Sequence, residues 1–550
     1  MAGAEQKLHG VEQQKKVVSC FEKHGGNISA VANELNLQRS TIRHHLRNAG
    51  AGKKPLAGGK ISGTKENRLS LPRGENIKRY ILTAAQNNTL VHEDFWENVL
   101  ALAEFYDARI MVGTFSYNQN HYGKLAVKRG KAKSAENSLW FDERLKPYFS
   151  DERVELAPGL TWCGEMNIQP TEQSPLSGLE TYVGPSSVIF PHTKVEMRSV
   201  ATTAATPVKL LYTTGCVTLM NYVQKKAGLK AEHHHRYACI VAEVDSKGNW
   251  WVRQVAARKN GHSIQDLNVL VENGKVISMG CYVEAITWGD LHATKIDPVC
   301  TASSLDMLDT LHPKFQFLHD AMEGASINPH TRKHKDNHEQ FETWLNGLQK
   351  VTEEVKRTKV VLESYLREWC QTILPDANHD RRWFRQWLQD FDYRKDPGNA
   401  EFFLRLQAFM YAEMRSGKLP KNVNLMQHIF EVDGGMKPGA AKFLLPDEPF
   451  TVCGVECGMH GNLGPNGVYG APGNLSKIGT KATTGHTHVA GIYHGLYVAG
   501  TSTKLTADWG YTVGPSAWTH SHVVLYPNGQ RTVVTLCGGK WHAGAAAVTV

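Results

Sequence analysis

Short apolar runs alternate with amphipathic helical stretches between residues 77 and 283. Residues 80–84 have the pattern of a strand, 93–106 that of an amphipathic helix and 108–112 that of the next strand, which together predict a βαβ unit. Further candidate strands are residues 188–190, 208–212 and 239–242. The pattern predicts an α/β domain over 77–283. This domain contains no motif that indicates a reaction. Its role is therefore undecided between an oligomerisation surface, a DNA clamp and an autoinhibitory cover.

The first 48 residues have a different pattern, with apolar positions at helical spacing in three short pieces. Asn27 or Ser29 can cap the second piece, and residues 36–38 supply a tight turn before the third. This predicts a small all-α helix-turn-helix module over 1–48, whose last helix presents a basic side to DNA. Its candidate DNA-binding residues are Arg39, Arg43, His44 and Arg47. A bundle with a solvated basic face or a protein-binding module is the alternative.

Residues 49–76 are rich in Gly, Lys, Ser and Pro, a composition that cannot bury enough apolar surface to order itself. We expect a flexible basic linker there. Three adjacent histidines at 233–235 cannot all turn toward one ion from a regular element, so they are interpreted as a solvated or nucleic-acid-facing cluster. No internal repeat at a fixed period is visible.

Composition narrows the class of protein. The chain of 550 residues is 41% hydrophobic and 21% charged, which is typical of a globular protein with several domains. The net charge of +9 favours a polyanionic partner such as DNA. No apolar run could cross a membrane, the N-terminus lacks the apolar core of a signal peptide, and the 10 cysteines are scattered. These features predict a cytoplasmic protein without a membrane partner.

The second half of the chain repeatedly places metal-ligand residues after a strand-like apolar run. The runs are residues 284–289, 315–318, 371–375, 451–455 and 481–484. The residues that follow them are Asp290 and His292, His319 and Asp320, Asn378 to Asp380, His460, and His486 and His488. Because side chains at the carboxyl ends of strands converge on one crevice, these five clusters predict one shared site. Carboxylate, imidazole and amide ligands suit Mn²⁺, Zn²⁺ or Fe²⁺ better than Mg²⁺ alone.

The order D-x-H, D, N-H-D, H-G and G-H-x-H resembles the calcineurin-like metallophosphoesterase superfamily over residues 284–550. The resemblance implies an α/β fold of two layers, a sandwich of mixed β-sheets flanked by helices, with two divalent metal ions. The ligands of the first metal would be Asp290, His292, Asp320 and His488. Those of the second would be Asp320, Asn378, His460 and His486, with Asp320 as the bridge. His379 would be the histidine that assists the leaving group, so that His379, Asp290 and Asp320 form the catalytic set.

Two motifs depart from the family. The second motif is usually G-D-x-x-D, whereas this chain has H-D-A-M-E at 319–323, and Ala377 replaces the usual glycine before Asn378. A decoy N-H-E at 337–339 is rejected because it follows a polar stretch and opens a helical pattern. Apolar residues from about 336 to 370 recur at helical spacing and predict a helical insertion, one helix or a hairpin, packed in the core.

The function that follows is hydrolysis of a phosphodiester by a water that two metals activate, most naturally with Mn²⁺ and with DNA as substrate. The arrangement also resembles the pre-early host-DNA-degrading proteins of T-odd bacteriophages, which implies a phage protein acting in the host cytoplasm, and the nuclease subunit of double-strand-break repair complexes. Two alternatives stay open. One is a small-substrate phosphatase or cyclic-nucleotide phosphodiesterase, and the other is a DNA-binding regulator with a structural phosphoesterase domain.

Overall fold

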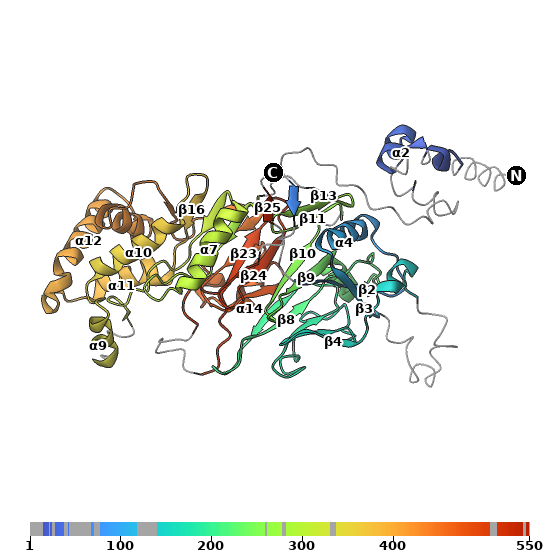
Figure 1. Cartoon of the computed structure of the whole chain (residues 1–550). Coiled ribbons are helices and arrows are strands. Elements are labelled where there is room, and N and C mark those ends of the chain that lie inside the picture. The colour runs from blue at the N-terminus through green and yellow to red at the C-terminus, as the bar shows by residue number, and fades with distance from the viewer. Residues whose placement is uncertain are drawn as a thin grey trace. The chain divides into compact units, whose positions relative to one another are not determined.

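A computed structural model describes most of the chain. The described residues are 15–20, 23–24, 28–37, 42, 68–70, 77–117, 140–258, 261–277, 282–329, 337–505, 514–542 and 546–548. The chain divides into two compact units, Met1–Ser62 and Gly63–Val550. The second unit mixes β-sheets and helices, which confirms the predicted α/β class (Figure 1). None of the helices in the described ranges is long and apolar enough to cross a membrane.

The first unit contains the helix α2 (Ile28–Leu35) within the predicted helix-turn-helix. Val31 of this helix packs with Val17, Cys20 and Ile42 in a small buried cluster. Asn36 follows α2 with a φ of 49°, the left-handed conformation that the predicted turn requires. The candidate DNA-binding residues Arg39, Arg43, His44 and Arg47 lie outside the described residues.

A six-stranded mixed sheet forms the centre of the second half of the chain. In spatial order its strands are β17 (Lys442–Phe443), β16 (Gln371–Leu374), β15 (Phe315–Phe317), β14 (Ala285–Thr287), β23 (Ser521–Leu525) and β24 (Arg531–Thr535). The first four are parallel, and β23 and β24 are antiparallel to their neighbours. Because β14, β15 and β16 are parallel, the residues that follow them meet at one edge of the sheet.

Helices cover one face of this sheet. They are α7 (Pro298–Leu311), α10 (Val351–Tyr365), α11 (Trp383–Asp390), α12 (Pro397–Arg415) and α13 (Leu425–His428). Ile286 of the sheet is buried in one core with Met307, Leu362 and Phe384 of these helices. On the opposite face, Phe317 and Ile373 pack against Val455 of a second sheet. The sheet is therefore enclosed between helices and another sheet.

The second sheet has ten strands and joins the two halves of the unit. In spatial order they are β18 (Thr451–Val452), β19 (Val455–Glu456), β20 (Ala482–Thr484), β22 (Leu496–Val498), β21 (Gly491–Tyr493), β7 (Met197–Val200), β8 (Lys209–Thr213), β6 (Ser187–Phe190), β5 (Leu160–Cys163) and β4 (Arg153–Ala157). The boundary predicted at residue 283 therefore does not separate two compact units, because β7 pairs with β21 in one continuous sheet.

The predicted βαβ unit is present at the start of the second unit. β2 (Lys78–Gln86), α4 (Glu93–Tyr106) and β3 (Arg109–Phe115) form it, and β9 (Ala238–Val244) and β10 (Trp250–Ala256) complete a four-stranded sheet in the order β10-β9-β2-β3. Leu82 and Ile240 of this sheet share a buried core with Tyr212 of the ten-stranded sheet and Val533 of β24. A meander of β11 (Ser263–Asp266), β12 (Val269–Glu272) and β13 (Lys275–Ile277) follows.

Two predicted segments differ from the structure. The linker predicted over 49–76 includes β1 (Arg68–Ser70), which pairs with β25 (Ala546–Val548), because a strand needs only a partner edge and not an apolar composition. The helical stripe forms two helices, α9 (Asn337–Leu345) and α10. Only α10 is packed in the core, whereas Phe341 and Trp344 of α9 are 59% and 54% exposed.

Candidate metal centre

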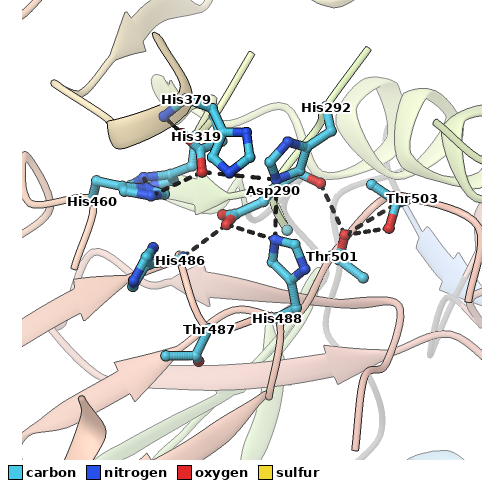
Figure 2. A network of polar contacts seen from close by, with 12 residues as sticks. Asp290, His292, His319, His379, His460, His486, Thr487, His488, Thr501 and Thr503 are labelled. Atoms are coloured by element: carbon cyan, nitrogen blue, oxygen red, sulfur yellow. Dashed lines mark hydrogen bonds and ion pairs between the residues drawn. The ribbon is translucent and has the colours of Figure 1, made fainter. Parts of the chain in front are cut away.

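The five predicted clusters converge at one place at the edge of the six-stranded sheet. Asp290 and His292 follow β14, Asp320 follows β15, His460 follows β19, and His486 and His488 lie between β20 and β21. Asn378 and His379 begin a π-helical turn, Asn378–Arg382, directly after β16. Figure 2 shows the labelled histidines gathered around Asp290, with Thr487, Thr501 and Thr503 further out. The loops after β14, β15 and β16 meet because these strands are parallel, whereas His460, His486 and His488 come from loops of the ten-stranded sheet that packs against them.

The first group of side chains contains Asp290, His292 and His488. His488 Nε2 lies 3.2 Å from Asp290 Oδ2 and 3.1 Å from His292 Nε2. All three residues are buried, and one donor atom of each lies within 4.8 Å of the others. Three nitrogen and oxygen donors at this spacing are able to share one cation.

The second group is built around Asp320 and His460. His460 Nε2 lies 3.1 Å from Asp320 Oδ2 and 3.0 Å from Asn378 Oδ1, and His486 completes a set of three donors with Asp320 and His460. Asp320 Oδ2 also lies 3.8 Å from His292 Nε2, in the first group. Asp320 thus lies between the two groups, where a bridging carboxylate would have to lie.

Four of these residues have a backbone conformation that is uncommon for residues with side chains. φ is 40° at His292, 39° at Asp320, 73° at His486 and 58° at His488. Each left-handed residue of this kind costs roughly 1–3 kcal/mol, and such residues are concentrated at functional sites. The surrounding structure therefore holds these four residues in a strained backbone conformation that directs their side chains toward the cluster.

The electrostatics of the cluster favour two ionised carboxylates. Burial opposes the charge on Asp290, but His460 and His488 outweigh it and hold the pKa of Asp290 at about 2. Burial likewise opposes the charge on Asp320, yet His460 and His379 keep its pKa well below its usual value. Burial disfavours a charged His460, but Asp320 and Asp290 raise its pKa to about 9. The cluster therefore has a negative core that attracts positive charge.

Two observations test whether these residues fit a metal ion. Among the described residues, no hydrogen-bond partner reaches the buried atoms Asp290 Oδ1 and His319 Nε2, an arrangement that is costly unless a ligand satisfies them. Gly485 borders Asp290 so closely that a Cβ at residue 485 would lie 2.2 Å from Asp290 Oδ1. The donor set and the space beside it fit divalent metal ions.

His379 lies beside the cluster in a fixed orientation. Its Nδ1 lies 2.9 Å from the carbonyl oxygen of Glu323, and its ring packs on Trp383 with centroids 3.8 Å apart. The Glu323 carboxylate lies 2.9 Å from Nδ1 of His292. Burial lowers the pKa of His379 and raises that of Glu323 to about 7.

Two buried carboxylates hold the loop that carries Asp320. Asp380 accepts hydrogen bonds from the backbone N–H of Ala321 and Met322, at 3.1 and 2.9 Å. Glu354 of α10 accepts from the N–H of Gly324 and Ala325, at 2.5 and 3.1 Å. The helical insertion therefore contributes directly to the position of the loop after β15.

A cavity of about 1010 Å³ opens onto the cluster. Its lining includes Asp320, His379 and His488 together with Arg382, Tyr469 and Trp518. Tyr469 is 73% exposed, and its hydroxyl lies 3.2 Å from His486 Nε2. The Trp518 ring meets that of His488 at a centroid distance of 4.3 Å. Aromatic and basic side chains thus line the cavity, together with the carboxylates of Glu323, Glu339 and Glu342.

The two ligand sets expected from the sequence included neither His319 nor Glu323. Both belong to groups of three possible metal ligands, His319 with Asp290 and His460, and Glu323 with His292 and His379. The sequence feature that could have identified them is their position, because both lie close to Asp320 after the same strand.

Asp297 and His312 lie outside the five clusters and have structural partners. Asp297 caps α7, and His312 stacks on Trp369 with centroids 3.6 Å apart. The interpretation of residues 233–235 as a solvated cluster is wrong for His235, which is buried with its Nδ1 2.8 Å from the Tyr222 hydroxyl. Adjacent residues at a helix end point in different directions, so one of the three enters the core.

Comparison with known proteins gives one informative similarity. The chain is 34% identical to "Protein A1" of Escherichia phage T5 over 502 residues, which cover 89% of this chain and 86% of that protein. No family profile and no solved structure matches the chain.

Proposed function

The chain belongs to the same family as Protein A1 of Escherichia phage T5, and we propose that it is a phage-encoded, metal-dependent nuclease that acts in the cytoplasm of the infected bacterium. The observation that carries the proposal is the position of Asp320 between two groups of candidate ligand residues, most of them buried. Two adjacent metal sites that share a carboxylate are a recurring arrangement for the hydrolysis of phosphate esters.

The proposed ligands follow the two groups. Asp290, His292, Asp320 and His488 would hold one ion, and Asp320, Asn378, His460 and His486 the other. The imidazole content favours Mn²⁺, with Zn²⁺, Fe²⁺ and Mg²⁺ as alternatives. When bound, two such ions activate a water molecule and polarise the phosphoryl oxygens. A calcineurin-like phosphoesterase fold is part of the proposal for residues 284–550, supported by the contact between the two sheets and by the helices on one face of the six-stranded sheet.

His379 would serve the leaving group. Its hydrogen bond to the Glu323 carbonyl keeps a proton on Nδ1, so that Nε2 is the atom that exchanges a proton. Trp383 and Glu323 hold the ring beside the cavity that would contain the scissile phosphate. In its protonated form, His379 donates the Nε2 proton to the departing oxygen.

DNA is the proposed substrate because the same chain carries a net charge of +9 and a predicted N-terminal DNA-binding module. Arg382 lines the cavity and supplies a cation near the bound phosphate. Because a net positive charge also suits other polyanions, the experiment compares DNA with a small phosphodiester.

The decisive experiment is cleavage of supercoiled plasmid with Mn²⁺, Mg²⁺ or a chelator. We expect cleavage by the wild type with Mn²⁺, and loss of cleavage in Asp320→Asn and His379→Ala. Asp447→Asn is a matched control, because Asp447 is exposed and its positive φ suits asparagine equally. Cleavage of bis(p-nitrophenyl) phosphate with plasmid left intact would contradict the nuclease and assign a small-substrate phosphodiesterase. Plasmid binding that Asp320→Asn leaves unchanged, without hydrolysis of either substrate, would assign a DNA-binding regulator.

A further inference from the structure

The second compact unit contains the same arrangement of strands twice. The first lobe is defined here as residues 78–256 and the second lobe as residues 285–535. In the first, β2 pairs with β3 in parallel and with β9 antiparallel, and β9 pairs with β10 antiparallel. In the second, β14 pairs in the same directions with β15 and β23, and β23 with β24. The helix between the first two strands, α4 or α7, has 14 residues in both lobes.

The two halves of the ten-stranded sheet repeat in the same way. The order β4-β5-β6-β8-β7 matches β18-β19-β20-β22-β21, and each pairing has the same direction as its counterpart. The strands also follow one another along the chain in the same order. The halves meet where β7 pairs antiparallel with β21, at the middle of the sheet.

Glycines mark equivalent turns in the two lobes. The hairpin from β4 to β5 turns at Gly159 with φ 79°, and that from β18 to β19 at Gly454 with φ 75°. The hairpin from β9 to β10 turns at Gly248 with φ 82°, and that from β23 to β24 at Gly529 with φ 77°. The repeat has no fixed period because β16, β17 and the helices between residues 318 and 442 interrupt only the second lobe.

The loop with two of the proposed metal ligands has a direct counterpart in the first lobe. Residues 485–490 between β20 and β21 read G-H-T-H-V-A, and residues 191–196 between β6 and β7 read P-H-T-K-V-E. The loops are equally long and share His, Thr and Val. His192 therefore corresponds to His486, and Lys194 to His488.

The other ligand positions of the first group are also replaced. Asp290 forms a parallel bridge with Thr501 after β22, and its carbonyl accepts from the N–H of Ser502. Ala84 forms the equivalent parallel bridge with Cys216 after β8, and its carbonyl accepts from Val217. Ala84 thus stands where the second lobe has Asp290. Gln86, two residues further on, stands at the place of His292.

The first lobe fills its own site with protein atoms. His192 is fully buried, with its Nε2 3.2 Å from the carbonyl oxygen of Gln169 and its Nδ1 accepting from the N–H of Lys194 at 3.1 Å. Lys194 is 3% exposed, and its ammonium donates to the carbonyl oxygens of Glu172 and Gln173. At the positions that correspond to His486 and His488, the first lobe thus has a buried histidine and a buried ammonium that bond to backbone carbonyls of Gln169, Glu172 and Gln173.

We propose that residues 78–256 are a second copy of the catalytic lobe that has lost its metal site and that holds the loop of His486 and His488 in place through β7. The inference rests on the proposed function, because it concerns the same metal centre. β7 reaches that loop directly. Met197 and Arg198 pair with Ile492 and Gly491, and the Ser199 hydroxyl donates to the carbonyl of Ala490 at 2.8 Å.

The first test counts metal ions per chain. Full-length protein is equilibrated with Mn²⁺ and freed of loosely bound ions, and the metal is measured by mass spectrometry. We expect two ions per chain in the wild type, in His192→Asn and in Lys194→Met, and fewer in Asp290→Asn. Four ions per chain, or fewer ions in a folded His192→Asn than in the wild type, would overturn the proposal that the first lobe has lost its metal site. No ions in the wild type would contradict the proposed function instead, and the second test then decides the role of β7.

The second test needs no metal. Hydrogen exchange of the peptide covering residues 485–493 is compared between wild type, Ser199→Ala and the exposed control Ser246→Ala. Ser199→Ala loses one hydrogen bond to the loop, so we expect exchange of this peptide to become roughly five-fold faster. In Ser246→Ala, we expect the exchange rate of the peptide to equal that of the wild type. Equal exchange in all three proteins would overturn the positioning role of β7.

Discussion

The backbone of Gly485 lies against the carboxylate of Asp290, with no room for a side chain between them. A Cβ at residue 485 would lie 2.2 Å from Asp290 Oδ1, an oxygen in the proposed metal centre. The N–H of the next residue, His486, donates to the other oxygen of Asp290 at 2.9 Å. The loop from β20 to β21 and the loop after β14 are therefore fitted to each other at this carboxylate.

Gly485→Ala is expected to displace Asp290 and to weaken metal binding roughly 10- to 100-fold, the usual effect of disturbing a ligand's support. Titration calorimetry with Mn²⁺ measures the change. Gly479→Ala is the matched control, because a Cβ at residue 479 meets no atom within 4 Å. Equal Mn²⁺ affinity in the two variants would show that Asp290 is not a ligand.

Removal of metal is expected to lower the thermal stability of the wild type. Mn²⁺ at 100 times its dissociation constant should stabilise the fold by about 2.7 kcal/mol, because it binds only the folded chain. Calorimetric melting with and without a chelator measures this difference. In Asp290→Asn the two melting curves should coincide. A wild type whose melting is unaffected by Mn²⁺ would contradict the metal centre.

Glu354→Ala is expected to destabilise the protein and to reduce the proposed nuclease activity, although Glu354 is not a proposed ligand. Its loss leaves the buried N–H groups of Gly324 and Ala325 without an acceptor, at roughly 1–3 kcal/mol. Urea unfolding and plasmid cleavage measure the two effects. Glu353→Ala, on the same helix but with an exposed partner, Lys356, should change neither by a comparable amount.

Arg253 is expected to be indispensable for the fold. It is buried and bonds to Asp266 at 2.7 and 2.8 Å and to Glu243 at 2.8 Å. Arg253→Met would take its guanidinium partner from the buried Asp266, leaving it the Tyr106 hydroxyl, and would leave Glu243 bonded to Arg79; we expect it to destabilise the protein by about 3–5 kcal/mol. Urea unfolding compares it with the exposed control Arg394→Met. A loss no larger than that of the control would refute the role of this buried network.

Buried histidines make stability depend on pH. Burial lowers the pKa of His192 to about 3, whereas in the unfolded chain it lies near 6.5. The unfolded state therefore binds more protons between these values. The contribution of His192 is complete above pH 6.5 and falls by up to about 1.4 kcal/mol per unit as the pH decreases toward 3. His192→Asn lacks this dependence, so its deficit in unfolding free energy should shrink between pH 7 and pH 5. A constant deficit would exclude the effect.

The strands and the candidate ligands could be predicted from the sequence because both depend on local patterns. The runs before Asp290, Asp320 and Asn378 became β14, β15 and β16, and the periodic stretch 93–106 became α4 with the same bounds. The same local logic failed for α9, whose apolar residues are exposed. Periodicity defines an apolar side of a helix but does not supply a surface to cover it.

The sequence by itself predicted most of the side chains that the structure brings together in the candidate metal centre, since a ligand must have a particular side chain after a strand. Tertiary structure alone decided how those residues meet. It placed Asp320 between two groups, gave His292 and Asp320 left-handed backbones, and added His319 and Glu323. It also joined the two lobes through β7 and β21, where a boundary was expected. These features depend on pairing between strands that are hundreds of residues apart, and no local pattern encodes such a pairing.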